Sequence, residues 1–343
     1  MEKLTQLSEM GEFSLIEELN KDNIIYNTST LLGVGDDCAI LDYKEKQVLI
    51  STDALAEGVH FDLVYTPLKH LGYKACISNF SDIYAMNGEP KQIVISLSVS
   101  SKYTLEALQE LYEGIRLACK KYKVDIVGGD TTSSKSGMFI SITVIGQGEK
   151  EKIVQRKGAK KNDLICVTGD LGAAYSGLLV LQREKATFLA NPTFQPNLKQ
   201  YEYVLQRHLR PEAQKKTIDF FREKNILPTS MIDISDGLAS ECLHICKQSK
   251  VGCEVYLEKL PINYQTSKTL EELKILPETA ALNGGEDYEL LFTIDQKDYD
   301  KIKDEQNIAV IGYITDENLG CKLVTAQNTT MDIKAQGFNH FKN

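Results

Sequence analysis

Apolar, β-rich runs alternate with amphipathic stretches along most of this 343-residue chain. Gln92 to Val99 and Leu164 to Thr168 predict buried strands, and Gln47 to Ile50 predicts a strand that runs into Ser51-Thr52-Asp53. Between such runs, apolar residues recur at helical spacing. This alternation is the pattern of an α/β protein. Because domains usually span about 100–200 residues, the length favours two of them.

The first strong helix signal lies between Thr66-Pro67, which marks a beginning, and Asn87-Gly88-Glu89-Pro90, which marks an end. Asn79 and Asp82 lie three residues apart on a face of this helix other than its core face, which leaves Asp82 free to point at a ligand. The residues at helical spacing on the core face are Cys76, Phe80, Ile83 and Tyr84.

The next helix is predicted to begin after Thr104, a residue that can cap its first turn. Val124 to Val127 then predicts a short strand that ends at Gly128-Gly129-Asp130. Phe139 to Ile145 predicts another strand, with Gly146-Gln147-Gly148 as a turn after it. The apolar stripe of the helix comprises Leu105, Leu108, Leu111, Tyr112, Ile115 and Cys119.

A second unit is predicted to begin near Lys150. Its first strand ends in Gly169-Asp170-Leu171-Gly172 and leads into a helix. Met231 to Gly237 joins a strand to a helix, and Tyr288 to Ile294 predicts a final strand after Gly284-Gly285-Glu286-Asp287.

Acidic residues follow several of the apolar strands. In open α/β sheets ligands bind beyond the carboxyl ends of strands, and neighbouring glycines allow close approach of backbone and ligand. Crowded carboxylates repel one another unless cations neutralise them, and Mg²⁺ prefers such oxygen ligands while keeping positions for phosphate oxygens. The pattern therefore predicts Mg²⁺-dependent phosphoryl transfer. The segments are Gly33-Val34-Gly35-Asp36-Asp37, Ser51-Thr52-Asp53, Gly128-Gly129-Asp130 and Asp233-Ile234-Ser235-Asp236-Gly237.

Composition narrows the classes of partner. The formal net charge is −9, which argues against a nucleic-acid-binding surface. The longest apolar runs fall short of the roughly 20 residues that span a bilayer, and the N-terminus lacks the pattern of a secretory signal. Eight scattered cysteines favour a reducing, cytoplasmic setting over a disulfide framework.

Other motifs are weaker. The chain contains no Walker A loop, and Gly33-Val34-Gly35 lacks the third glycine of a dinucleotide fingerprint, because Cys38 stands there. Cys242 and Cys246 are spaced like a metal pair, yet the apolar residues on their helix face favour core packing. His60, shortly after Asp53, is a candidate ligand contact, whereas His70, His208 and His244 have no partner evident in the sequence.

Taken together, these motifs resemble the thiamine-monophosphate kinase family, within the superfamily of aminoimidazole-ribonucleotide synthetase. The resemblance extends from Gly11-Glu12-Phe13 to Gly337-Phe338-Asn339-His340-Phe341, nearly the whole chain. The blocks are specific in their order and spacing, and they are Gly33 to Ala39, Ser51 to Phe61, Asn79 to Met86, Gly128 to Thr132, Arg156 to Ala159, Thr168 to Gly172, Arg207 to Pro211, Asp233 to Leu238 and Gly284 to Leu290.

The resemblance implies ATP-dependent phosphorylation of thiamine monophosphate to thiamine diphosphate by direct transfer. It implies that Gly129, Arg156 and Ser235 contact ATP together with Asp130, with Tyr112 as a weaker contact. His60, Glu286 and Phe338 would shape the thiamine-phosphate site, where an aromatic ring suits the cationic thiazolium. Asp53, Asp130, Arg156 and Asp236 would be catalytic. The implied ligands of several Mg²⁺ ions are Asp37, Ser51, Thr52, Asp53, Asp82, Asp130, Asp233 and Asp236.

The implied fold has an N-terminal mixed-sheet α/β domain, residues 1–149, that binds ATP and Mg²⁺ and forms a homodimer. A C-terminal α/β domain, residues 150–343, completes the ATP and substrate site. Two segments depart from the family pattern: Asn87-Gly88-Glu89, and Phe338-Asn339 in the terminal motif. Neither removes an implied metal ligand.

Three relatives in the superfamily are alternatives. Selenophosphate synthetase would need a reactive residue near the N-terminus, but the first cysteine here is Cys38. The hydrogenase-maturation relative would need a C-terminal cysteine, and this sequence ends Phe341-Lys342-Asn343. Aminoimidazole-ribonucleotide synthetase itself fits the motifs less well. A non-catalytic sensor of nucleotide or thiamine phosphate would bind the same ligands without turnover.

Overall fold

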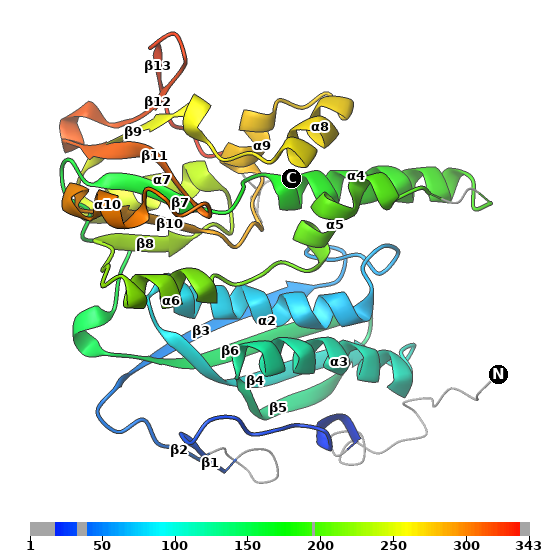
Figure 1. Cartoon of the computed structure of the whole chain (residues 1–343). Coiled ribbons are helices and arrows are strands. Elements are labelled where there is room, and N and C mark those ends of the chain that lie inside the picture. The colour runs from blue at the N-terminus through cyan, green and yellow to red at the C-terminus, as the bar shows by residue number, and fades with distance from the viewer. Residues whose placement is uncertain (1–17, 33–39, 194–195, 337–343) are drawn as a thin grey trace. The chain divides into compact units, whose positions relative to one another are not determined.

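The computed structural model describes residues 18–32, 40–193 and 196–336 and divides the chain into two compact units. The first comprises residues 1–84 and 88–151, and the second comprises residues 85–87 and 152–343 (Figure 1). Both units are mixed α/β structures, as predicted. Within the described ranges, no helix has the length and apolar character needed to cross a bilayer.

The N-terminal unit is built on a four-stranded sheet in the order β3-β6-β4-β5, where β4 and β5 are parallel and the other pairs antiparallel. Two helices, α2 and α3, cover one face (Figure 1). Its described elements are β1 (Thr30–Leu32), β2 (Ile40–Leu41), β3 (Gln47–Ala56), α2 (Leu68–Ala85), β4 (Glu89–Ser100), α3 (Leu105–Tyr122), β5 (Asp125–Ser134) and β6 (Met138–Gly148).

The predicted helix faces are confirmed. Every predicted core residue of α2 and α3 is buried, with an exposed fraction of at most 8%. Thr104 caps α3, since its hydroxyl accepts a hydrogen bond from the Ala107 N–H at 3.3 Å. The two helices pack closely at Gly72 and Gly114.

Two strand ends differ from the prediction. Gly146-Gln147-Gly148 is part of β6 rather than a turn, because these residues pair with Leu49, Val48 and Gln47 of β3. Likewise β5 runs through Gly128-Gly129-Asp130 to Ser134, where it pairs with β4. Polar and glycine-rich sequence is kept extended here by pairing with a neighbouring strand, a non-local interaction that local propensity does not report.

The C-terminal unit contains a seven-stranded sheet in the order β13-β12-β9-β11-β7-β10-β8, antiparallel except for the pair β12 and β9. One face packs against α7 in a core of aliphatic and cysteine side chains. On the other face Phe221 of α6 meets Phe292 of β10, with ring centroids 4.9 Å apart. The elements are β7 (Leu164–Thr168), α4 (Ala173–Ala190), α5 (Glu202–Leu209), α6 (Lys215–Glu223), β8 (Ser230–Asp233), α7 (Leu238–Ser249), β9 (Gly252–Tyr256), α8 (Tyr264–Glu272), α9 (Pro277–Asn283), β10 (Leu290–Ile294), α10 (Tyr299–Ile302), β11 (Ile308–Thr315), β12 (Cys321–Val324) and β13 (Thr330–Asp332).

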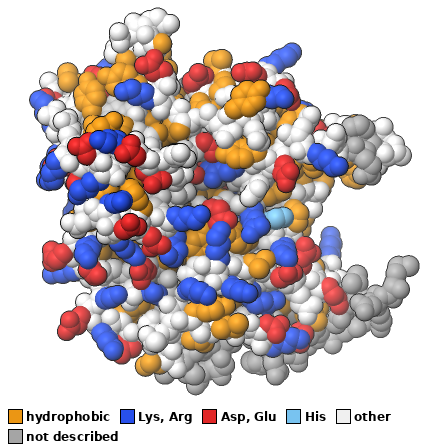
Figure 2. All heavy atoms as spheres, in the orientation of Figure 1, with side chains coloured by type: hydrophobic (Ala, Val, Ile, Leu, Met, Phe, Trp, Pro, Cys, Tyr) orange, Lys and Arg blue, Asp and Glu red, His pale blue; other side chains and the backbone are white. Residues whose placement is uncertain are grey.

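Surface charge of both signs is interspersed. Figure 2 shows Lys and Arg side chains among Asp and Glu side chains, with hydrophobic groups between them. Many form exposed pairs, such as Lys215 Nζ with Asp219 Oδ2 at 2.5 Å. Pairs of this kind contribute at most about 1 kcal/mol each, so the fold depends chiefly on the two cores and on the buried polar groups described below.

Candidate active site

In the N-terminal unit, β3 and α2 bring four of the singled-out polar residues together. Successive side chains of a strand alternate between its faces, so Ser51 and Asp53 share the face that packs on α2. The Ser51 hydroxyl donates to Asp82 Oδ2 at 2.5 Å, and the Asp53 N–H donates to Asn79 Oδ1 at 3.2 Å. The expectation that Asp82 and Asn79 share a side of α2 is confirmed, and that side faces β3.

Thr52 lies on the opposite face of β3. Its hydroxyl donates to the Ile142 carbonyl at 3.1 Å and accepts from the Thr143 hydroxyl at 3.0 Å. A metal bound between β3 and α2 could therefore be reached by the backbone of Thr52 and not by its side chain. That Thr52 is a metal ligand stays a prediction, and the ligand atom would belong to its backbone rather than to its side chain.

Both carboxylates of this group, Asp53 and Asp82, are partly buried, and the pKa of Asp53 shows the effect. Burial raises its pKa above the ordinary value, while a hydrogen bond from Ser78 and the nearby His60 lower it. A carboxylate whose charge is disfavoured by burial gains most from a bound cation. The donor set, with two carboxylates and a hydroxyl from β3 and α2, fits the hard oxygen ligands that Mg²⁺ takes.

His60 follows β3 in the loop that reaches Phe61. Its Nδ1 accepts a hydrogen bond from the Ala56 N–H at 3.1 Å. In the neutral ring the proton is therefore on Nε2, which can donate to an acceptor such as a phosphate oxygen.

The predicted nucleotide residues of this unit lie on β5 and α3. Asp130 and Gly129 are exposed on β5, where a Cβ at Gly129 would lie 2.1 Å from the Ile95 carbonyl oxygen. The close approach of β4 thus requires glycine there. Tyr112 is 5% exposed on α3, and burial raises its pKa to about 12. Its place in the core stripe is confirmed, and its nucleotide contact stays a prediction. Asp37 lies outside the described residues.

In the C-terminal unit the acidic motif joins β8 to α7. Asp233 ends β8 and is buried, whereas Ser235 and Asp236 are exposed in the loop before α7. Glu241 of α7 lies behind this loop and accepts a hydrogen bond from the Asp236 N–H at 3.1 Å. Sequence reasoning did not single out Glu241, because it sits inside a helix with no motif around it.

Negative charge is concentrated at this loop. Burial, together with the charges of Asp236 and Asp233, raises the pKa of Glu241 to about 8. Its Oε2 atom is buried without a hydrogen-bond partner. An excess of carboxylate charge with an unsatisfied oxygen is the environment that a cation would stabilise, so these residues also fit Mg²⁺.

A second loop, residues 284–289, is hydrogen bonded to the acidic motif. The Glu286 N–H donates to the Ser235 carbonyl at 2.7 Å, and the Tyr288 N–H donates to the Ile234 carbonyl at 3.0 Å. Glu286 and Tyr288 have φ values of 58° and 51°, a left-handed conformation that costs about 1–3 kcal/mol per non-glycine residue. Such conformations persist only where surrounding interactions enforce them.

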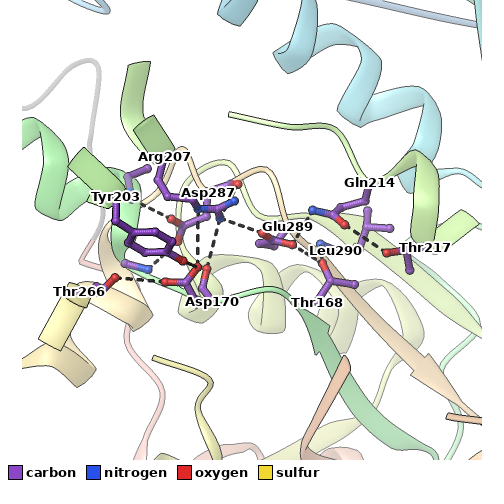
Figure 3. A network of polar contacts seen from close by, with 12 residues as sticks. Thr168, Asp170, Tyr203, Arg207, Gln214, Thr217, Thr266, Asp287, Glu289 and Leu290 are labelled. Carbon is purple, nitrogen blue, oxygen red and sulfur yellow. Dashed lines mark hydrogen bonds and ion pairs between the residues drawn. The ribbon is translucent and has the colours of Figure 1, made fainter. Parts of the chain in front are cut away.

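A buried network of ion pairs and hydrogen bonds behind the loop holds these residues in place (Figure 3). Arg207 of α5 forms an ion pair with Glu289 at 2.8 Å, and its Nε lies 3.6 Å from Asp170 Oδ1. Asp287 accepts hydrogen bonds from the N–H groups of Gly172 and Ala174 at 2.7 and 3.1 Å, at the start of α4. The network therefore ties the loop to three other segments of the unit.

The protonation of this network is set by burial. Burial raises the pKa of Asp287 to about 7 and also raises that of Glu289, although the charge of Arg207 opposes both shifts. Burial alone would lower the pKa of Arg207, but Glu289, Asp287 and Asp170 raise it, so the guanidinium stays charged. Further donors are Thr168 and Gln214 to Glu289, and Tyr203 and Thr266 to Asp170 (Figure 3).

The segments of this network are among the motifs that carry the family resemblance. The sequence alone assigned no role to Arg207, Asp287 or Glu289. A usable signal was present: two carboxylates directly before the apolar run of β10 must be buried, and buried charges require a partner. His208 was expected to have no identifiable partner, yet its Nδ1 lies 3.4 Å from Glu286 Oε2.

The remaining predicted residues are less constrained. Arg156 is exposed, and its carbonyl accepts from the Ser249 hydroxyl at 3.4 Å. Phe338 lies outside the described residues. Cys242 and Cys246 are buried on α7, which confirms the core packing expected of them.

A protein-family model matches part of the N-terminal unit. The AIR synthase related protein, N-terminal domain, matches residues 35–147. The thiamine-monophosphate kinase of Bacillus subtilis is 35% identical over 340 residues, covering 97% of this chain and all of the relative. The chain belongs to the thiamine-monophosphate kinase family. The enzyme class that the sequence predicted, a thiamine-phosphate kinase, is thereby confirmed.

Further relatives agree with this membership. The thiamine-monophosphate kinase of Escherichia coli K12 is 34% identical over 96% of this chain and 98% of its own. A solved structure described as AaThiL complexed with AMPPCP and TMP matches with a TM-score of 0.76 and 31% identity, covering 99% of this chain and 100% of the other. The hydrogenase maturation protein HypE has a TM-score of 0.75 at 18% identity, a likeness that concerns the fold alone. The fold predicted from the sequence is confirmed by these structures.

Proposed function

We propose that this enzyme transfers the γ-phosphoryl group of ATP to the phosphate of thiamine monophosphate, giving thiamine diphosphate and ADP in thiamine biosynthesis. The observation that carries the proposal is the carboxylate arrangement at β3 and α2, found in a chain that aligns with thiamine-monophosphate kinases over nearly its full length. A relative solved with AMPPCP and TMP supports the choice of substrates.

Several Mg²⁺ ions would be held by the carboxylates of both units. Bound there, they would neutralise the negative charge that the reacting phosphates carry. The β3–α2 group and the β8–α7 loop each have the donor chemistry and the unsatisfied charge that such ions require. The proposed ligands are Asp37, Ser51, Thr52 (through its backbone), Asp53, Asp82, Asp130, Asp233 and Asp236.

The chain's own residues would bind and orient the two substrates. Gly129, Asp130 and Ser235 would contact ATP, with Tyr112 as a weaker contact, and Arg156 would hold a phosphate by its guanidinium. His60, Glu286 and Phe338 would contact thiamine monophosphate, His60 by donating from Nε2. The acceptor is already an anionic phosphate, so direct in-line transfer needs positioning and charge neutralisation rather than a strong general base.

We also propose that two chains associate through the uncovered face of the N-terminal sheet. Val48 and Ile50 of β3 and Phe139 of β6 are exposed at 46%, 69% and 43% and point away from α2. Val48 and Ile50 lie two residues apart on this face, and Phe139 lies further along it, opposite Ala56. Exposed apolar side chains on a sheet face are typical of an interface. Light scattering should give a dimer that Ile50→Lys converts to a monomer; a monomeric wild type would contradict this.

The proposed reaction is tested with purified protein, Mg²⁺, ATP and thiamine monophosphate, by following thiamine diphosphate and ADP. The proposal predicts equal amounts of both products, abolished by EDTA and restored by Mg²⁺. ATP binding without thiamine diphosphate would contradict it and would favour another acceptor or a sensor. Incubation with γ-labelled ATP alone should leave the protein unlabelled, because a labelled phosphoenzyme is incompatible with direct transfer.

A further inference from the structure

Three cysteine side chains converge in the C-terminal unit, away from the acidic motifs. Cys246 lies on α7, Cys253 on β9 and Cys321 on β12, and these elements are adjacent in Figure 1. Their sulfur atoms all lie within 4.8 Å of one another. Among the residues that the structure describes, they form the one group of three or more His, Cys, Asp or Glu side chains gathered this closely.

The backbone holds these positions before any ligand binds. Cys253 and Cys321 are register partners in the parallel pair β9 and β12, so their side chains lie on the same face of the sheet. α7 packs on that face and ends at Ser249, and the N–H of the capping residue Lys250 bonds to the Cys246 carbonyl. The chain then turns directly into β9, with the Cys253 N–H bonded to the Gly320 carbonyl at 3.1 Å. All three cysteines therefore sit on regular secondary structure, held by backbone hydrogen bonds.

The spacing suits a metal ion. Four-coordinate Zn²⁺ with Zn–S bonds of about 2.3 Å places its sulfur ligands about 3.8 Å apart. The separations of the three sulfur atoms, all within 4.8 Å, are compatible with that spacing. Three thiolates are soft ligands, which select Zn²⁺ or Cu(I) over the Mg²⁺ that carboxylates bind.

The burial of the three sulfurs is uneven. Cys246 and Cys253 are 4% and 0% exposed, whereas Cys321 is half-buried. An ion could therefore enter past Cys321, and a water molecule could occupy the fourth position. Buried free cysteine often serves only as a small apolar side chain. Cys166 on β7 is of that kind, since no second cysteine contributes to its raised pKa.

We propose that Cys246, Cys253 and Cys321 form a binding site for a thiophilic ion of the Zn²⁺ class, separate from the residues proposed to bind Mg²⁺. The site ties α7 to the edge of the sheet formed by β9 and β12. Since the α7 N-terminus follows the acidic loop, the ion would fix the helix that carries that loop. The proposal does not depend on the substrate of the enzyme.

The test uses the full-length, reduced protein in metal-free buffer with excess Mg²⁺, so that carboxylate sites are filled. Co²⁺ is titrated as a spectroscopic substitute for Zn²⁺. The proposal predicts an intense thiolate-to-cobalt charge-transfer band that saturates at one ion per chain and disappears when Zn²⁺ is added. Cobalt bound to carboxylates gives no such band, so its absence would overturn the proposal.

Two variants locate the site. Cys321→Ser changes the half-buried ligand and should weaken Co²⁺ binding by at least about 100-fold, because even residues that merely support metal ligands contribute about 10- to 100-fold. Cys166→Ala removes a buried thiol from the opposite face of the same sheet and should leave the titration unchanged. An undiminished band in Cys321→Ser would refute the assignment.

A measurement on the wild-type protein tests the site without relying on a variant that could fail to fold. Cys321 is the half-buried cysteine of the three, so an alkylating reagent is expected to modify it in the metal-free protein. Zn²⁺ at stoichiometric concentration should protect it, as read by peptide mass spectrometry. Equal alkylation with and without Zn²⁺ would overturn the proposal independently of any substitution.

Discussion

The buried Arg207 network permits a quantitative prediction. Arg207→Met keeps much of the side-chain volume but removes the charge that compensates Glu289, whose side chain is only 2% exposed. Removing one partner of a buried ion pair typically costs about 3–5 kcal/mol, because the remaining charge stays buried. The variant also loses hydrogen bonds to the carbonyls of Asp170 and Asp287. We therefore expect a loss of about 3–5 kcal/mol in the free energy of unfolding of the C-terminal unit at pH 8.

This loss should depend on pH in a defined direction. In the folded wild type the pKa of Asp287 is raised to about 7 and that of Glu289 is also raised, so the folded state binds more protons than the unfolded state up to about that pH. Stability accordingly falls as pH rises through this window. Without Arg207 both pKa values rise further, so the deficit of the variant is largest at pH 8. It shrinks as the pH falls below the folded pKa of Asp287, where that carboxyl is protonated.

The assay is thermal unfolding followed by circular dichroism, at pH 5 and pH 8. For a unit of this size about 1 kcal/mol corresponds to roughly 2–4 °C, so the midpoint at pH 8 should fall by roughly 6–20 °C. Lys215→Met is the control, because Lys215 forms an exposed pair with Asp219 in the same unit and its loss should cost under about 1 kcal/mol. A change of less than about 1 kcal/mol in Arg207→Met, or an equal change at both pH values, would refute the reasoning.

Three further predictions concern other parts of the structure. Gly114→Ala should destabilise the N-terminal unit by about 1–3 kcal/mol in urea unfolding, since the new Cβ would lie 1.9 Å from the Lys69 carbonyl oxygen; unchanged stability would show that the helices can separate at no cost. His60→Phe should raise KM for thiamine monophosphate and leave KM for ATP unchanged in steady-state kinetics, and a rise confined to ATP would move His60 to the nucleotide site. Glu241→Gln should gain stability relative to wild type as pH rises from 5 to 8 in EDTA, because the folded pKa of about 8 makes ionisation destabilising; parallel pH profiles would contradict the burial of that carboxyl.

Local patterns predicted the elements whose signals are local. The helix stripe of α3 and its Thr104 cap follow from spacing and from a side chain that satisfies a nearby N–H. β7 was predicted at its observed bounds, because its apolar run is bounded on both sides by polar or glycine residues. Such features depend on neighbours within a few positions.

Features that depend on residues far apart in the sequence were harder to predict. The extension of β6 through Gly146-Gln147-Gly148 depends on pairing with a strand about a hundred residues earlier in the chain. Which face of β3 packs on α2 became evident only from the contact between Ser51 and Asp82. Likewise Arg207 and Glu289 are far apart in sequence, so their pairing required the fold.

The proposed reaction requires that the carboxylates at β3 and α2 carry Mg²⁺-dependent turnover. The most direct measurement compares Asp53→Asn with Asp42→Asn, an exposed control of the same kind in the same unit, in thiamine diphosphate formation across a Mg²⁺ titration. The account predicts that Asp53→Asn lowers kcat by about 100-fold or more, with an unchanged unfolding midpoint, whereas Asp42→Asn retains wild-type kinetics. A folded Asp53→Asn enzyme with wild-type kcat and Mg²⁺ dependence would contradict the claim.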